Sequence, residues 1–148
     1  MTVRSLGRTT LLVRDYDKAL TFYRDRLGFR VLHDERRPNG DRYLHIGVGG
    51  LLHGESSGGL WLLEAKGDDD ALVGRQAGQH PFLVLYTDNC TATVDELEQA
   101  NVEIRKPPTY ADGATFAHIA DLYGNELLIV QLERLTPAVT QAIRARGK

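Results

Sequence analysis

The chain has little cysteine and no long apolar run. Its 148 residues include one cysteine, Cys90, which excludes an intrachain disulfide and is typical of a reducing compartment. No stretch is long and apolar enough to span a bilayer, and the first eight residues lack the apolar segment of a signal peptide. We therefore expect a soluble, cytoplasmic protein with no membrane partner.

The chain also lacks an excess of positive charge. It has 18 Lys and Arg against 20 Asp and Glu, which gives a net charge of −2 and a pI near 6.2. This balance creates no basic field that would attract nucleic-acid phosphates, so we expect no nucleic-acid partner. Hydrophobic residues make up 42% of the chain, and its length suits one globular domain or two small modules that share a core.

What the sequence does contain is an internal repeat. Residues 40–46 (Gly-Asp-Arg-Tyr-Leu-His-Ile) return as residues 113–119 (Gly-Ala-Thr-Phe-Ala-His-Ile), at an offset of 113 − 40 = 73. Upstream, residues 15–23 are matched by residues 89–97, at an offset of 89 − 15 = 74. The matches lie in pattern more than identity, so two ordinary strand-helix segments that resemble each other by chance are the alternative. Duplication predicts one supersecondary unit used twice, with any functional surface between the copies.

Hydrophobic periodicity predicts the same order of elements in both halves. In the first half we expect a strand at 8–14, a helix at 16–27 and strands at 29–33, 43–48 and 60–65. In the second half we expect a strand at 82–86, a helix at 91–100, extended chain at 102–109 and strands at 114–120 and 126–132. The predicted fold is α+β, with β-α-β-β-β modules at residues 5–66 and 80–133. A linker at 67–79, with a helical turn near 71–75, joins them, and the tail at 134–148 forms a short amphipathic helix or a frayed end.

Two motifs resemble the vicinal oxygen chelate superfamily, which includes glyoxalase I, the bleomycin-resistance proteins and the extradiol dioxygenases. They are Asp15…Ala19-Leu-Thr-Phe-Tyr23…Leu27-Gly-Phe29 in the first half and Asp121-Leu-Tyr-Gly-Asn125 in the second. The second departs from the usual Asp-Pro-x-Gly-Asn, because Leu122 stands where proline is usual. The resemblance covers roughly residues 5–133. It implies two modules whose curved sheets form a cup, helices outside the cup, a ligand or metal inside it, and a homodimer.

Alternation along the strands assigns side chains to the two faces of each sheet. The side chains expected beneath the helices are Leu44, Ile46, Val48, Ala117 and Ile119. The side chains expected to face the cup are Tyr43, His45, Phe116 and His118. The repeated imidazoles could bind an anionic or carbonyl-bearing ligand or act as acid and base near neutral pH. The alternative is two half-buried histidines satisfied by their neighbours. We interpret His33 and His53 as exposed turn or loop residues.

The resemblance also implies where a metal would bind. In metal-dependent members, ligands come from the first and fourth strands of each module, and here those positions hold Arg8, Trp61, Phe82 and Leu128. None has a side chain that ligates divalent ions, so the sequence predicts no metal and no cofactor. One alternative stays open, because a one-residue shift in strand register turns every side chain over. Its donors would come from Glu64, His80, His45 and His118.

These expectations define a candidate ligand site. The residues expected to line the cup are Arg8, Tyr43, His45, Trp61, Phe82, Tyr86, Phe116 and His118. Aromatic walls with one arginine and two histidines suit a small aromatic or oxygenated molecule; the alternative is that these aromatics fill the core. The sequence favours a metal-free small-molecule-binding protein of the bleomycin-resistance type. A glyoxalase-like lyase or isomerase, a dioxygenase with an atypical metal site, and an assembly subunit remain alternatives, so whether it is an enzyme stays open.

Overall fold

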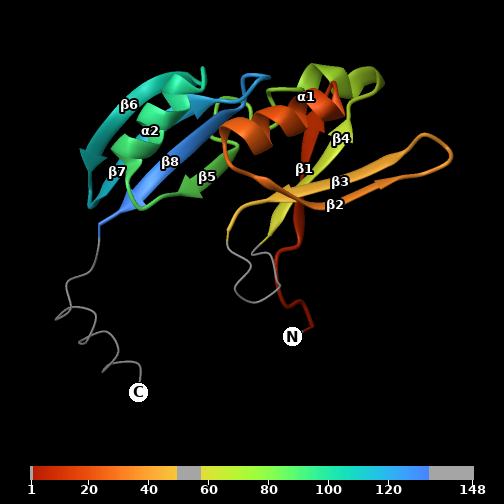
Figure 1. Ribbon diagram of the computed structural model, residues 1–148, viewed down its shortest axis with the longest axis horizontal. Helices are drawn as coiled ribbons and strands as arrows, with labels where there is room; N and C mark the ends of the chain where they lie inside the picture. Colours follow the sequence, from red (N-terminus) through yellow and green to blue (C-terminus); the bar gives the residue numbers. More distant parts are fainter. Residues whose placement is uncertain (1, 50–57, 134–148) are drawn as a thin grey trace.

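Two four-stranded sheets lie side by side, and one α-helix covers each of them on the same side of the molecule (Figure 1). The structure is a computed structural model, and it describes residues 2–49 and 58–133. The expected tail at 134–148 and the loop histidine His53 lie outside the described residues. Among the described residues, none of the helices has the length and apolar character needed to cross a bilayer.

The first module follows the predicted order. Its elements are β1 (Arg8–Val13), α1 (Tyr16–Thr21), η1 (Phe22–Arg26), β2 (Arg30–Arg36), β3 (Arg42–Gly47) and β4 (Gly59–Glu64). The strands lie in the order β1-β4-β3-β2, with β1 parallel to β4 and the other pairs antiparallel. A 3-10 helix, η2 (Gly67–Leu72), then leads toward the second module.

The second module repeats this connectivity. Its elements are β5 (Leu83–Tyr86), α2 (Cys90–Gln99), β6 (Glu103–Ala111), β7 (Ala114–Ala120) and β8 (Glu126–Leu132), and its strand order is β5-β8-β7-β6. Strand register also matches, because His45 lies opposite Trp61 and His118 lies opposite Leu128. The α+β fold of two β-α-β-β-β modules with curved sheets is therefore confirmed.

Local signals in the sequence explain where the helices begin and end. The carboxylate of Asp15 accepts the backbone N–H of Lys18 at 2.9 Å, and the Asn89 side chain caps α2 in the same way. Gly28, with a φ of 78°, ends the first helix in the left-handed conformation. Three details differ from the predictions. The first helix becomes a π-helix over its last part, the linker turn begins at Gly67 rather than near residue 71, and β2 continues to Arg36, three residues beyond the predicted end of that strand at His33.

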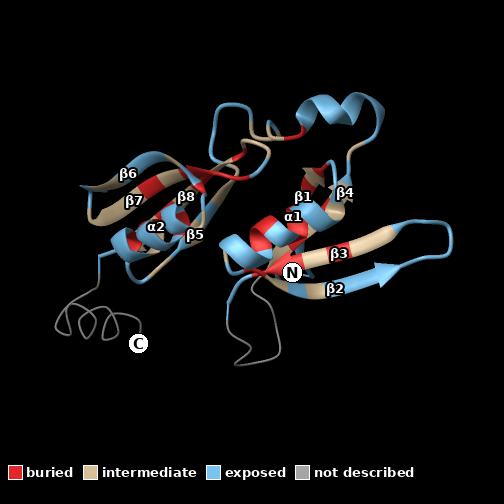
Figure 2. Ribbon diagram, turned by 45° about the horizontal axis from the view of Figure 1, so that its top comes forward, coloured by how far each residue is buried: buried red, intermediate tan, exposed pale blue. Residues whose placement is uncertain are grey.

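One hydrophobic core extends through both modules between the helices and the sheets (Figure 2). Its most buried members in the first module include Leu11, Val13, Tyr23, Leu44, Ile46 and Leu62. In the second they include Cys90, Val94, Leu97, Ala117, Ile119 and Leu127. The predicted helix-facing residues are therefore correct except for Val48, which is 41% exposed because β3 ends one residue before it.

The Asp-Leu-Tyr-Gly-Asn turn joins the modules through a buried carboxylate. Asp121 accepts the Tyr23 hydroxyl at 2.6 Å and the Asn125 side-chain amide at 2.8 Å. Its other oxygen accepts the backbone N–H groups of Tyr123 and Asn125, each at 2.9 Å. Burial, and then the charge of Asp121, raises the pKa of Tyr23 well above its usual range. Both motifs behind the family resemblance thus meet in one structural contact.

The linker is packed against both modules. The Gln76 side chain accepts the N–H of Leu12 at 2.7 Å and donates to the carbonyl of Thr10 at 3.0 Å, so that it covers the free edge of β1. Gly74 has a φ of 78°, and a Cβ there would collide with the Tyr123 carbonyl. The backbone therefore approaches the turn as closely as glycine allows.

Candidate functional site

The face of each sheet opposite its helix, here called the open face, carries the candidate site residues. On the first sheet, the buried Leu11, Leu44 and Leu62 point toward the helix. Their neighbours in sequence therefore point to the open face. These open-face residues are Thr10, Leu12, Tyr43, His45, Trp61 and Leu63.

The His45 imidazole is enclosed by polar and aromatic neighbours. Its Nδ1 accepts the Arg8 Nε–H at 3.0 Å, and its ring lies 5.4 Å from Trp61 and 5.6 Å from His33 between centroids. Burial, and then the charges of Arg8 and His33, lowers the pKa of His45. The neutral ring carries its proton on Nε2, which is buried and has no hydrogen-bond partner among the described residues. His33 is exposed, as predicted, but it lies inside β2 and beside His45 rather than at a turn.

An aromatic hollow adjoins this histidine. The Tyr43 and Trp61 rings stack 6.1 Å apart at 25°, and the Arg37 guanidinium lies 4.5 Å above the Tyr43 ring. The two rings, together with Leu12 and Leu63, form the apolar part of a hollow of about 400 Å³, here called the aromatic hollow. The indole Nε1 of Trp61 is buried, and no described residue accepts its proton. The hollow therefore combines flat aromatic surface with charged side chains, which are Asp41, Arg42, Glu64, Lys66 and Asp69.

A second hollow of about 410 Å³ shares Tyr16, Arg42 and Glu64 with the aromatic hollow. Its central cation is Arg42, which donates two hydrogen bonds to Asp34 at 2.9 Å and one to Asp17 at 2.8 Å. These bonds lower the pKa of both carboxyl groups and raise that of Arg42. Because Arg42 bonds to carboxylates of both β2 and α1, this network fixes the β2–β3 hairpin to the start of α1.

The open face of the second sheet carries a histidine–carboxylate pair. His118 Nδ1 lies 2.9 Å from Glu126 Oε1, and about a quarter of each side chain is exposed. The Phe116 ring lies 5.9 Å from the imidazole, and the Lys106 ammonium lies 5.1 Å from the centre of the Phe116 ring. Sequence reasoning selected Phe116 and His118 but missed Glu126 and Lys106. Strand pairing could have found Glu126, because it is two residues before Leu128, the residue opposite His118, and faces the same side.

The remaining predicted residues occupy different surroundings. Arg8 lies beside His45, and Phe82, just before β5, packs against the core. Tyr86 ends β5 and is 72% exposed. The predicted residues form two groups, one on each sheet. No described contact joins His45 to His118.

A family model described as the Glyoxalase/Bleomycin resistance protein/Dioxygenase superfamily matches residues 5–129. The chain belongs to this superfamily. An uncharacterized protein of Shewanella frigidimarina (strain NCIMB 400) is 31% identical over 138 residues, which cover 90% of this chain and 98% of that relative.

Solved structures of the superfamily fold align over most of the chain. UcmS2 has a TM-score of 0.73 and 27% identity, and the match covers 88% of this chain and 98% of UcmS2. TnmS3 from Streptomyces sp. CB03234, described as an antibiotic binding protein, has a TM-score of 0.73 and 23% identity, with 90% of this chain and 99% of TnmS3 covered. The likeness to TnmS3 concerns the fold.

Strand register identifies the residues at the positions where the superfamily holds its metal. Strand register places Thr10 opposite Trp61 and Val84 opposite Leu128, so Arg8 and Phe82 occupy equivalent places in the two modules. These side chains supply no donor for a divalent ion. Within residues 2–49 and 58–133, no three His, Cys, Asp or Glu side chains are grouped so that they could hold a metal, and this includes the alternative set with Glu64 and His80. The donor set does not fit the superfamily's metal.

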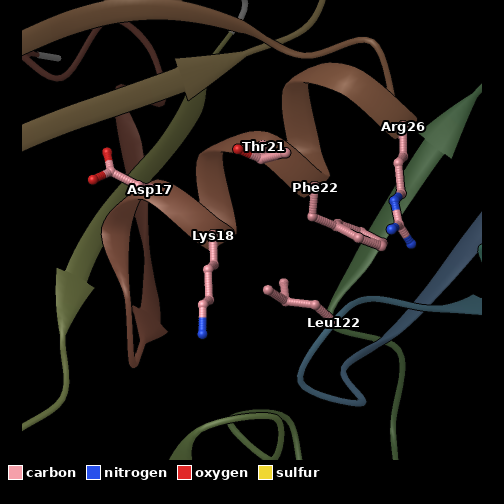
Figure 3. A pocket seen from close by; sticks show the side chains of 6 residues that line it. All are labelled: Asp17, Lys18, Thr21, Phe22, Arg26 and Leu122. Atoms are coloured by element: carbon pink, nitrogen blue, oxygen red, sulfur yellow. The ribbon is translucent and has the colours of Figure 1, made fainter.

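A further hollow of about 400 Å³ lies on the outer side of α1, away from both open faces (Figure 3). The residues around it are Asp17, Lys18, Thr21, Phe22, Arg26 and Leu122. Leu122 contributes from the turn of the second module. This hollow is shallow and charged at its rim, and none of the predicted site residues reaches it.

Proposed function

We propose that this protein binds a small, planar, partly apolar molecule in the aromatic hollow and along the open faces, without the superfamily's usual metal. The observation that carries this proposal is the stacked pair of Tyr43 and Trp61 in a hollow of about 400 Å³. That volume falls within the usual range for small-molecule sites. Aromatic faces bind planar ligands by offset stacking.

The proposed ligand-binding residues come from both modules. They are Arg8, Tyr43, His45, Trp61, Phe82, Tyr86, Phe116 and His118. TnmS3 is described as an antibiotic binding protein, and this supports a small-molecule ligand by analogy of fold. We also propose a cytoplasmic location, and its support is the buried thiol of Cys90, the chain's single cysteine.

The fluorescence of Trp61 tests the proposal directly, because it is the chain's single tryptophan and it lines the hollow. A panel of planar aromatic compounds should include members that change this fluorescence saturably and raise the melting temperature. Tyr43→Ala should weaken that binding, whereas Tyr110→Ala, which alters an exposed tyrosine, should leave it unchanged. A panel with no saturable response would refute the proposed function. One equivalent of zinc, iron, manganese or nickel in protein purified without added metal would refute its metal-free part.

We propose further that two copies of the chain form a homodimer and that β5 contributes to the contact. The other edge strands are protected, because Gln76 covers β1, charged residues 34–36 occupy β2, and Pro107 and Pro108 interrupt β6. β5 contains no charge and no proline, and its Val84 is 49% exposed. An uncharged apolar edge of this kind pairs readily with another chain.

Light scattering after size exclusion checks the dimer. Val84→Lys places a charge on the exposed edge of β5 and should give a monomer. Val31→Lys places the same charge at a 40% exposed position on β2 and should leave the dimer intact. A wild-type monomer, or two variants that behave alike, would contradict the proposed contact.

A further inference from the structure

The two histidines at equivalent positions of the repeat are held in opposite tautomers. Arg8 donates its N–H to His45 Nδ1, so the neutral His45 ring has its proton on Nε2. The ionised Glu126 carboxylate has only acceptor oxygens, so His118 Nδ1 carries the proton that joins the pair. The Nε2 of a neutral His118 therefore has a free lone pair. One copy of the repeat supplies a donor and the other supplies an acceptor.

The residues around His118 suit a ligand group that becomes negatively charged when it gives up a proton. Glu126 on β8 is paired with Nδ1 and would stabilise a positive imidazolium. Lys106 on β6 lies opposite His118 in register, and its ammonium stands over the Phe116 ring. Leu128, the residue opposite on β8, is apolar. Among the described residues, the charged groups placed near this imidazole include the Glu126 carboxylate, which is paired with it, and the Lys106 ammonium, which attracts an anion.

We propose that His118 accepts the proton of an acidic hydroxyl group on the ligand, a phenol or an enol, which then binds as its anion beside Lys106. The ligand O–H bond breaks, its electron pair stays on the oxygen, and the proton forms a new bond to His118 Nε2. No oxidant or further reactant is needed. The resulting pair of imidazolium and oxyanion forms a charge-assisted hydrogen bond. This inference rests on the proposed binding function and specifies the chemical class of the ligand.

A coloured phenol tests the proposal, with 4-nitrophenol and its methyl ether 4-nitroanisole as paired probes. The two have similar shape, but only the phenol has a proton to give, and its anion absorbs visible light. At a pH where free 4-nitrophenol is mainly neutral, wild-type protein should bind both probes and produce the absorption band of the phenolate. His118→Gln should abolish that band and weaken phenol binding by about tenfold or more while 4-nitroanisole still binds.

The matched control is His33→Gln. His33 forms a similar pair with Glu35, at 3.3 Å, on the exposed part of β2, so this variant loses an imidazole but should keep the band. Glu126→Gln should reduce the band, because the carboxylate that stabilises the imidazolium is lost. Circular dichroism establishes that each variant is folded.

The outcomes separate this inference from the proposed function. Binding of 4-nitroanisole with no phenolate band in the wild type would overturn the role of His118 and leave small-molecule binding standing. A band that persists in His118→Gln but disappears in Lys106→Met would overturn the inference in another way, because the ammonium alone would then stabilise the anion. Failure of both probes to bind would count against both proposals.

Discussion

Replacing Tyr23 with phenylalanine removes one hydroxyl from the buried contact between the modules. In the folded protein this hydroxyl donates to Asp121 at 2.6 Å, and the carboxylate is only 6% exposed. Loss of a hydrogen bond to a charged group that stays buried costs about 1.5–3 kcal/mol of unfolding free energy. For a chain of this size, that loss corresponds to a melting temperature lower by roughly 3–12 °C.

The pH dependence gives this prediction a second, independent readout. Because the pKa of Tyr23 is raised in the folded state, the unfolded chain loses this proton first as the pH rises. The stabilisation is therefore complete below about pH 10, the usual range for tyrosine, and declines above it. The difference in stability between wild type and Tyr23→Phe should be constant below that pH and should narrow above it.

Urea unfolding at a series of pH values measures both effects. Tyr110→Phe is the matched control, because its hydroxyl is exposed and lies 3.4 Å from Glu133. It should have nearly the wild-type midpoint. If Tyr23→Phe unfolds at the same urea concentration as Tyr110→Phe, the buried hydroxyl contributes no stability and the reasoning is wrong.

Three further substitutions probe the frame of the site. Gly74→Ala should lower the urea midpoint more than Gly40→Ala. Both glycines have a positive φ, which costs an alanine about 1–2 kcal/mol, but only at position 74 would the added Cβ collide with a backbone carbonyl. Gln76→Ala should speed hydrogen exchange at the Leu12 amide of β1, whose N–H donates to the Gln76 side chain in the wild type. Unchanged exchange would contradict the capping role of Gln76. Arg42→Lys should be less stable at neutral pH. Because Arg42 lowers the pKa of Asp34, the urea midpoint of Arg42→Lys should approach that of the wild type in acid. A difference in midpoint that stays constant with pH would contradict the ion pair.

Local patterns predicted much of the fold. Alternation correctly placed Ile46 and Ile119 beneath the helices, because side-chain direction in a strand has a fixed period of two residues. The bounds of β7 and β8 also match the predicted ranges. The extent of β2 was missed, since its outer half is polar and lacks the apolar alternation that marks a strand.

Pairing across strands was harder to predict for the candidate site. The repeat identified His45 and His118 as equivalent, but nothing in their immediate neighbours shows that one meets Arg8 and the other Glu126. These partners lie 37 and 8 residues away along the chain. Their opposite electrostatic surroundings follow from strand register. A one-residue error would change both partners, so the repeat alone could not assign their roles.

The contact between Tyr23 and Asp121 joins residues 98 positions apart, so the ribosome synthesises its two partners at different times. A nascent chain that has emerged from the ribosome only through β4 contains all the strands around α1 but still lacks the carboxylate that accepts the hydrogen bond of the Tyr23 hydroxyl. Because domains fold as units during translation, we expect the first module to stay incompletely ordered until the second turn emerges. A stop codon within the second module would then yield a fragment that chaperones and proteases recognise.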